Sequence, residues 1–397
     1  MQGQDDADER DGVVEASQDD ETRRAHSAAP RAPQGTTGDV GRLLRRGAKS
    51  ALARWVVTQH RRRITRPHAP QPRDEATHAW DGRRRFAEDY TFSVVQPGLG
   101  IVARLEWLPG RDANRLWLTV LRDGVAFSLP GGQLLHRGAS TDRWRAGGMT
   151  LDCLVPLSRW SLRYTGHLAP LQPGGPGIDA VAGGGTDGLL RCNVDLTFVA
   201  AAPPYTPGSD DDPELLAARL GEAQWDRALL RSVRRVTNRG YVQLGAMHGT
   251  IVLGDEVIPV RASALRQHFW GVRDWGASDH GFQCFIADAA GGHTWIHHAR
   301  FPFVTIEGGF QSDPGGHATP VKAVDISWES RPQRAPAHAT IIIPDANRVA
   351  PIELTMCSDS TFVVDGRGLV ALGLARVAGP GGGWALWGGQ RRWLPRR

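Results

Sequence analysis

The chain has 397 residues, of which 41% are hydrophobic, 48 are Gly and 26 are Pro. That is enough apolar material for two domains of ordinary size or one large β domain, and the many turn-forming residues disfavour a helical protein. The net charge of +5 is unevenly divided, since residues 1–22 are acidic, residues 23–85 are basic and the remainder is nearly neutral. This division argues against a nucleic-acid-binding surface on the main part of the chain.

The N-terminal part divides into three segments. Residues 1–40 are acidic and then rich in small and polar residues, so we expect a disordered tail. Residues 41–66 have apolar side chains near helical spacing among many Arg, which predicts a basic amphipathic helix. This helix either lies on an anionic membrane surface or packs against the body of the protein. The Pro-containing residues 67–84 are expected to form a linker.

From residue 85 onwards, short runs rich in β-branched and aromatic residues alternate with turn sequences such as GRDAN, RDG and LGDEV. This pattern predicts a β-sandwich or a β-barrel. Two stretches interrupt it. The Gly- and Pro-rich residues 171–188 predict a mobile loop, and residues 212–236 predict a helical connection that begins with Asp212 as N-cap and Pro213 in the first turn.

The densest motif is RQHFWGVRDWG at residues 266–276, downstream of a Y-x-Q-x-G-x-x-x-G-x-I segment. Together these segments resemble the AttH-like group, which includes the N-terminal domain of carotenoid 1,2-hydratases (hydroxyneurosporene synthases) and is related to tocopherol-cyclase-like proteins. The matching residues are Tyr241, Gln243, Gly245, Gly249, Thr250, Ile251, Arg266, His268, Trp270, Gly271, Arg273, Asp274 and Trp275, with a weaker match at Asn114–Leu118.

The resemblance extends over residues 86–397 and implies two lipocalin-like antiparallel β-barrels in tandem. We therefore expect an all-β protein with a first lipocalin-like domain at 85–236, which includes the helical connection, and a second at 237–397. Enzymes of the group act on isoprenoids, either adding water to a double bond or closing a ring through a protonated alkene. The group usually has R-D-H-S-W-G where this chain has Gln267 and Phe269 in place of the Asp and the Ser. If that Asp is the catalytic acid, this chain is not a hydratase of that kind.

Two hypotheses describe the motif. If it is a strand, one face carries the alternate residues Arg266, His268, Trp270, Val272 and Asp274. In the functional hypothesis, His268 and Asp274 are catalytic inside an apolar barrel, where burial keeps a carboxyl protonated and the Trp270 ring stabilises a carbocation. In the structural hypothesis, the motif braces two barrels, because Arg pairs with carboxylates and stacks on Trp. The residues that contact ligand or form the brace are Arg266, Trp270, Arg273, Trp275, Tyr241 and Gln243.

Other constellations are weaker. His280, His293, His297, His298 and His317 are close in sequence, but adjacent His297 and His298 point to opposite faces of a strand, so no metal site is expected. The chain lacks a P-loop, a dinucleotide-binding fingerprint and a GxSxG elbow, and no cofactor is expected. Cys153, Cys192, Cys284 and Cys357 form no CxxC pair, which favours reduced thiols.

The sequence thus predicts a cytoplasmic protein, with residues 41–66 placing it at a membrane surface in one alternative. Its expected partner is an apolar small molecule, isoprenoid or fatty, that is bound in a lipocalin-like barrel without chemistry. The alternative is an isoprenoid hydratase or cyclase that protonates an alkene. A third hypothesis is an interaction module whose barrels are filled by side chains.

Overall fold

A computed structural model describes residues 49–59, 69–138, 144–171, 188–223, 225, 239–329, 331, 334–344, 351–379 and 381–393. The contacts divide the chain into Met1–Arg45 and Arg46–Arg397, and only the second unit contains described residues. The predicted tail at 1–40 and all but the ends of the predicted loop at 171–188 lie outside the described residues.

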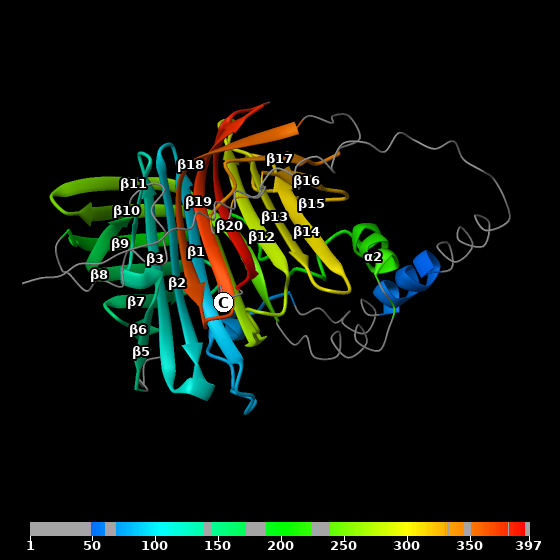
Figure 1. The fold of residues 1–397 in the computed structure, drawn as a ribbon, viewed down its shortest axis with the longest axis horizontal. Helices are drawn as coiled ribbons and strands as arrows, with labels where there is room; N and C mark the ends of the chain where they lie inside the picture. The colour runs from blue at the N-terminus through cyan, green and yellow to red at the C-terminus, as the bar shows by residue number, and fades with distance from the viewer. Residues whose placement is uncertain are drawn as a thin grey trace, which may run out of the picture. The chain divides into compact units, whose positions relative to one another are not determined.

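The first sheet closes into an eight-stranded antiparallel barrel, in the order β4-β3-β2-β1-β11-β10-β9-β8, because β4 also pairs with β8 (Figure 1). β5, β6 and β7 extend this sheet. Its strands are β1 (Phe86–Gln96), β2 (Leu99–Leu108), β3 (Ala113–Arg122), β4 (Val125–Ser128), β5 (Leu134–Arg137), β6 (Arg145–Ala146), β7 (Met149–Val155), β8 (Arg159–Leu171), β9 (Leu190–Ala200), β10 (Arg239–Leu253) and β11 (Glu256–Val272).

The second sheet is also antiparallel and curls into a half-barrel, in the order β15-β14-β13-β12-β20-β19-β18-β17-β16. Its strands are β12 (His280–Asp288), β13 (His293–Arg300), β14 (Thr305–Ser312), β15 (Ala318–Pro320), β16 (Asp325–Trp328), β17 (His338–Ile342), β18 (Pro351–Val364), β19 (Gly368–Ala378) and β20 (Gly383–Arg392). The expected all-β architecture is therefore confirmed, with one closed barrel and one half-barrel.

The change from one sheet to the other does not fall at the expected boundary of 236/237. β10 and β11, assigned from sequence to the second domain, pair with β9 and β1 and complete the first barrel. The reason is closure: without them, β1 and β9 would be exposed edges of an open sheet. The second sheet therefore begins only after Val272.

Turn chemistry and caps follow the sequence. Asp123 and Gly124 have φ values of 47° and 83°, which forms the tight turn expected at RDG between β3 and β4. The short helices are η1 (Pro72–Glu75), η2 (Pro109–Arg111), η3 (Pro130–Gly132) and α2 (Pro213–Glu222). Asp212 accepts hydrogen bonds from the first-turn N–H groups of α2, as predicted for an N-cap, while residues 226–238 lie outside the described residues.

The apolar side chains of the two sheets form three buried layers. The first fills the interior of the barrel, with residues such as Phe92, Leu118 and Phe198 fully buried. The second lies between the outer face of the barrel and the second sheet, and the third covers the opposite face of the second sheet. Because β1, β2, β3 and β11 contribute to the first two layers, both of their faces are buried, as expected for internal strands.

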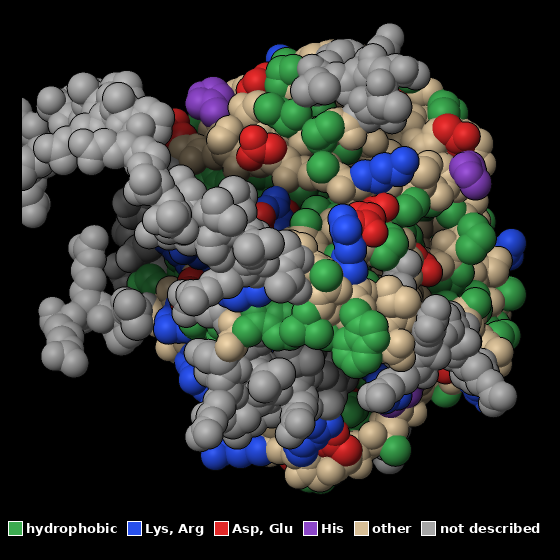
Figure 2. Space-filling view, turned by 90° about the vertical axis from the view of Figure 1, so that its right-hand side faces the viewer, with side chains coloured by type: hydrophobic (Ala, Val, Ile, Leu, Met, Phe, Trp, Pro, Cys, Tyr) green, Lys and Arg blue, Asp and Glu red, His purple; other side chains and the backbone are tan. Residues whose placement is uncertain are grey.

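The N-terminal helix packs on the body in its described part. Residues 49–59 are helical, Ala53 is fully buried and Arg54 forms an ion pair of 2.8 Å with Glu214 of α2. These contacts favour packing over a membrane surface for this segment. Figure 2 shows hydrophobic side chains interspersed with charged ones on the side of the molecule that bears α2. No helix among the described residues is long and apolar enough to cross a membrane.

Candidate functional site

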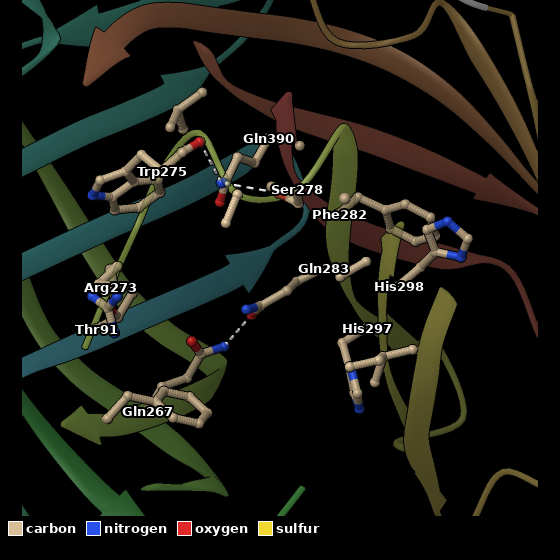
Figure 3. A pocket seen from close by; sticks show the side chains of 18 of the residues that line it. Thr91, Gln267, Arg273, Trp275, Ser278, Phe282, Gln283, His297, His298 and Gln390 are labelled. Carbon is tan, nitrogen blue, oxygen red and sulfur yellow. Dashed lines mark hydrogen bonds between the residues drawn. The ribbon is translucent and has the colours of Figure 1, made fainter. Parts of the chain in front are cut away.

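A concave pocket lies between the outer wall of the barrel and the second sheet (Figure 3). This cavity, which we call the inter-sheet pocket, has a volume of about 740 Å³. That size falls within the usual range for small-molecule sites, about 300–1,000 Å³. Its walls come from β1, β2, β3 and β11 of the barrel, from β12, β13, β19 and β20 of the second sheet, and from the loops at 273–278 and 301–304.

The alternation of β11 decides which motif residues reach this pocket. Gln267 and Phe269 line it, whereas Arg266 and His268 are buried within the barrel. On the neighbouring strand β1, Asp89 and its partners on the same face line the pocket, since Asp89 pairs with Phe269 in the register. One strand pair therefore serves two separate compartments.

Aromatic side chains make up much of the pocket wall. Trp117 and Trp275 lie with ring centroids 5.3 Å apart, and the guanidinium of Arg104 lies 4.6 Å from the Trp117 ring. Phe269, Phe285 and Trp295 continue the apolar surface.

Two tryptophans in the pocket wall have an indole N–H group that is not hydrogen-bonded. Within the described residues, the buried Nε1 atoms of Trp117 and Trp295 have no hydrogen-bond partner. Because buried donors are normally paired, such groups suit a bound molecule that supplies acceptor oxygens.

A network of ion pairs forms one side of the pocket. The Asp89 carboxylate lies 2.6 Å from Arg273 and 3.2 Å from Arg104, and its other oxygen accepts a hydrogen bond from Thr91. Arg273 also lies 2.9 Å from Glu106. Burial raises the pKa of the Asp89 carboxyl, while Arg104 opposes that effect. The wall of the pocket thus contains a buried carboxyl group held between two arginines.

Neutral polar side chains also line the inter-sheet pocket. Gln267 donates to Gln283 over 2.6 Å, so a hydrogen bond joins β11 to β12 across the pocket, as Figure 3 shows. Gln390 donates to the main-chain oxygen of Trp275 at 3.2 Å and lies 3.4 Å from Ser278. Amides and hydroxyls of this kind can accept or donate to a ligand without a change of charge.

The structure separates the two residues expected to act together in catalysis. His268 is fully buried in the barrel, whereas Asp274 lies on the loop after β11, where it pairs with Arg85. The expected placement of both inside one barrel is wrong because β11 ends at Val272, and the alternation that placed Asp274 beside His268 ends with it. Arg273 pairs with Asp89 and Glu106 and lies 5.8 Å from the Trp275 ring, which agrees with the brace hypothesis.

The remaining motif residues form a buried polar group within the barrel, which we call the Arg266 cluster (Glu75, Tyr241, Gln243 and Arg266). Arg266 binds both carboxylate oxygens of Glu75 at 2.8 Å, and Gln243 accepts from Arg266 at 2.6 Å. Tyr241 donates to Glu75 at 2.8 Å. Burial alone would raise the pKa of Glu75, but Arg266 and Tyr241 hold it below its ordinary value.

The Arg266 cluster shows that the expected assignment of residues 67–84 as a linker is wrong for the described part of this stretch. Glu75 belongs to that stretch, yet its side chain is buried in the barrel. The described part of the stretch therefore attaches to the barrel instead of connecting two bodies.

A comparison with known protein families also includes this segment in the same domain as the barrel. A model described as a domain of unknown function, DUF7064, matches residues 71–388. The chain belongs to this family. The match begins just before η1, so Glu75 is part of the DUF7064 domain. No curated protein matches the sequence.

Solved structures of other proteins share the fold of this chain. An AttH-like protein from Nitrosomonas europaea is 12% identical and aligns with a TM-score of 0.52 over 81% of this chain and 96% of its own. Kievitone hydratase from Nectria haematococca is 7% identical, with a TM-score of 0.47 over 77% of this chain and 87% of its own. The alignment with the AttH-like protein confirms the resemblance to the AttH-like group at the level of the fold.

A group of three side chains, separate from the inter-sheet pocket and the Arg266 cluster, has the ligand types of a metal site. His78, Glu88 and His268 place their ligand atoms within 4.8 Å of one another. The Glu88 Oε1 atom lies 2.9 Å from His78 Nδ1 and 3.0 Å from His268 Nε2. Burial lowers the pKa of His268, although Glu88 opposes this. By contrast, His297 and His298 approach different carboxylates, Asp211 and Glu307, as their opposite faces predicted.

Sequence reasoning missed Glu75, Glu88 and Asp89. A usable signal existed, because FAEDYTF places two adjacent acids in the middle of an apolar strand. Side chains of adjacent strand residues point to opposite faces, so one acid had to enter each compartment. Glu75 gave no such signal, since it lies in a Pro-rich segment without periodicity.

Proposed function

We propose that the inter-sheet pocket binds a neutral, largely apolar organic molecule that carries oxygen acceptors, with isoprenoid-type molecules as the favoured class. The aromatic-walled cavity of about 740 Å³ carries this proposal. We propose this position instead of the barrel interior that the sequence suggested, because buried apolar side chains of the first layer occupy the described interior of the barrel.

The preference for a neutral ligand rests on charge. Asp89 lies beside Arg104 and Arg273, and Asp274 lies beside Arg85, so these charges already have counter-charges within the protein. A fatty acid would have to compete with Asp89 for an arginine. A hydroxyl or carbonyl could instead accept from the indole N–H groups without disturbing the ion pairs.

Farnesol and palmitate provide the test, because they share an apolar chain and differ in charge. We expect farnesol to change Trp fluorescence saturably and to bind at least about tenfold more tightly than palmitate, a difference of about 1.4 kcal/mol. Organic extraction of the purified protein, followed by mass spectrometry, would identify a natural ligand directly.

Gly388→Leu is the decisive variant. Gly388 lines the pocket, and a Cβ at this position would meet no atom closer than 3.8 Å, so a larger side chain can occupy the cavity. It should abolish farnesol binding, while Gly388→Ala should retain it and serve as the matched control. Unchanged affinity in a folded Gly388→Leu protein would place the ligand elsewhere and refute the proposal.

A second candidate function, isoprenoid hydration or cyclisation by alkene protonation, is favoured by one observation. Asp89 is a buried carboxyl in the pocket whose pKa is raised by burial, and Trp117 and Trp275 lie close enough to the same space to stabilise a cation. Asp89→Asn should then abolish turnover of an isoprenoid alkene and retain ligand binding. Equal turnover in the Asn variant would exclude Asp89 as the acid.

A further inference from the structure

His78, Glu88 and His268 converge from three separate parts of the chain, on the barrel side of the β1–β11 wall. His78 comes from the segment before the barrel, Glu88 from β1 and His268 from β11. Both imidazoles approach the same carboxylate oxygen, at 2.9 and 3.0 Å. Glu88 and Asp89 are neighbours on one strand, so this group and the inter-sheet pocket lie on opposite faces of it.

Stacking fixes the orientation of both imidazole rings. The His78 ring lies on Trp270, with centroids 3.7 Å apart and planes 9° from parallel. The His268 ring lies on Tyr90, with centroids 4.0 Å apart and planes 18° from parallel. Because neither ring can turn freely, the nitrogen atoms facing Glu88 are held in place before any ligand arrives. A preformed ligand set of this kind lowers the entropic cost of binding an ion.

The other nitrogen of His268 has the partner that a metal-binding histidine usually has. His268 Nδ1 lies 3.4 Å from the Tyr241 hydroxyl, and that hydroxyl donates to Glu75. In the metal-free protein Nε2–H donates to Glu88 at 3.0 Å. Tyr241 can accept from Nδ1–H, so Nε2 would be the nitrogen that releases its proton and binds the ion. Metal-ligating histidines are commonly oriented in this way by a hydrogen bond at the second ring nitrogen.

We propose that His78, Glu88 and His268 form a binding site for a divalent transition ion, with Zn²⁺ as the reference ion. Zn²⁺ binds imidazole nitrogen and carboxylate oxygen at about 2.0–2.2 Å, which separates tetrahedral ligands by about 3.3 Å. The observed nitrogen–oxygen distances of 2.9 and 3.0 Å need to lengthen only slightly, and the two nitrogens, which lie within 4.8 Å of each other, would have to adopt the same separation. Three protein ligands leave a fourth position for water.

The exposure of the three side chains indicates how an ion would reach the site, and their positions indicate what the ion would stabilise. The His78 side chain is 23% exposed, whereas those of Glu88 and His268 are fully buried, so an ion enters from the His78 side. Once bound, it fastens residue 78 to β1 and β11. That residue follows closely on Glu75, so the ion stabilises the attachment of the same segment that the Arg266 cluster holds.

The test compares His78→Gln and Glu88→Gln with the control His248→Gln, in which an exposed histidine on β10 is removed. Calorimetric titration with Zn²⁺ and visible absorption with Co²⁺ measure binding near neutral pH. We expect one ion per chain in the parent and the control. The affinity should fall on the order of 100-fold or more in both site variants. At a hundredfold excess over Kd, Zn²⁺ should raise the unfolding temperature by about 5 °C, in the parent and control alone.

Equal Zn²⁺ affinity in His78→Gln and the parent would overturn the proposal, as would a lack of saturable binding in the parent. The three side chains would then form a hydrogen-bonded triad only. If Glu88→Gln does not fold, His78→Gln still decides, because its partly exposed position tolerates substitution. Farnesol binding is a separate readout, since none of the three residues lines the pocket.

Discussion

The two compartments on either side of the β1–β11 wall use the same kinds of side chain for different purposes. Within the barrel, Arg266 and Glu75 form a bidentate pair among the buried apolar side chains of the first layer. On the outer side, Arg273 shares two carboxylates with other arginines beside an open cavity. The comparison teaches that a buried Arg–carboxylate pair does not by itself mark a ligand site. Unpaired donors do not distinguish the two sides either, since Arg266 Nε and Trp160 Nε1 within the barrel also have no hydrogen-bond partner among the described residues. The free volume beside the pocket-side network is what distinguishes it.

The largest expected effect breaks the pair within the barrel. Arg266→Met leaves Glu75 buried with no cationic partner, and such a loss typically destabilises a protein by about 3–5 kcal/mol. Urea unfolding should show this decrease. The double variant Arg266→Met/Glu75→Leu removes both charges and should recover part of the loss. A single variant as stable as the parent would mean that the barrel interior admits water to Glu75.

The corresponding change on the pocket side should be milder. Arg273→Met leaves Asp89 beside Arg104, and Glu106 beside Arg104 and Arg115, so no carboxylate is left without a cation. We expect a decrease of about 1–3 kcal/mol in the free energy of unfolding. A decrease as large as that of Arg266→Met would show that the shared network is no more tolerant than the isolated pair.

Titration should sharpen the comparison, because the two compartments shift carboxyl pKa values in opposite directions. The pKa of Glu75 is lowered, so its contribution to stability is present above its unfolded pKa of about 4.3 and is lost as pH falls through the folded pKa. The pKa of Asp89 is raised by burial, so its contribution is present below about 3.9 and is lost as pH rises through the folded pKa.

Unfolding free energies measured across acidic pH for the parent, Glu75→Gln and Asp89→Asn would separate these contributions. Each unit of pKa shift corresponds to about 1.4 kcal/mol. Relative to the parent, Glu75→Gln should be least destabilised at low pH, and Asp89→Asn should be least destabilised at the upper end of the range. Two parallel difference curves would contradict the opposite shifts.

The sequence allowed the fold class to be predicted because turn residues and strand alternation are local signals. The RDG turn and the Asp212 cap are examples. The pairing of β1 with β11 could not be read locally, since it joins residues such as Phe86 and Val272 that are far apart in the sequence, and the domain boundary was misplaced for that reason. At the site, alternation correctly separated Arg266 and His268 from Gln267 and Phe269. It could not tell which face would be filled, nor that the strand would end before Asp274.

The smallest expected effect concerns Gln267, where the AttH-like group usually has Asp. Gln267→Leu removes the hydrogen bond to Gln283 that joins the two sheets across the pocket, which should lower stability by about 0.5–1.5 kcal/mol. Gln283→Leu should have a similar effect, and the double variant should cost less than the sum of the two, because the bond can be lost only once. Additive losses in this cycle would mean that the two amides do not interact in solution. The pocket side of β11 would then be joined to the second sheet by apolar packing alone, whereas the barrel side would still depend on its ion pair.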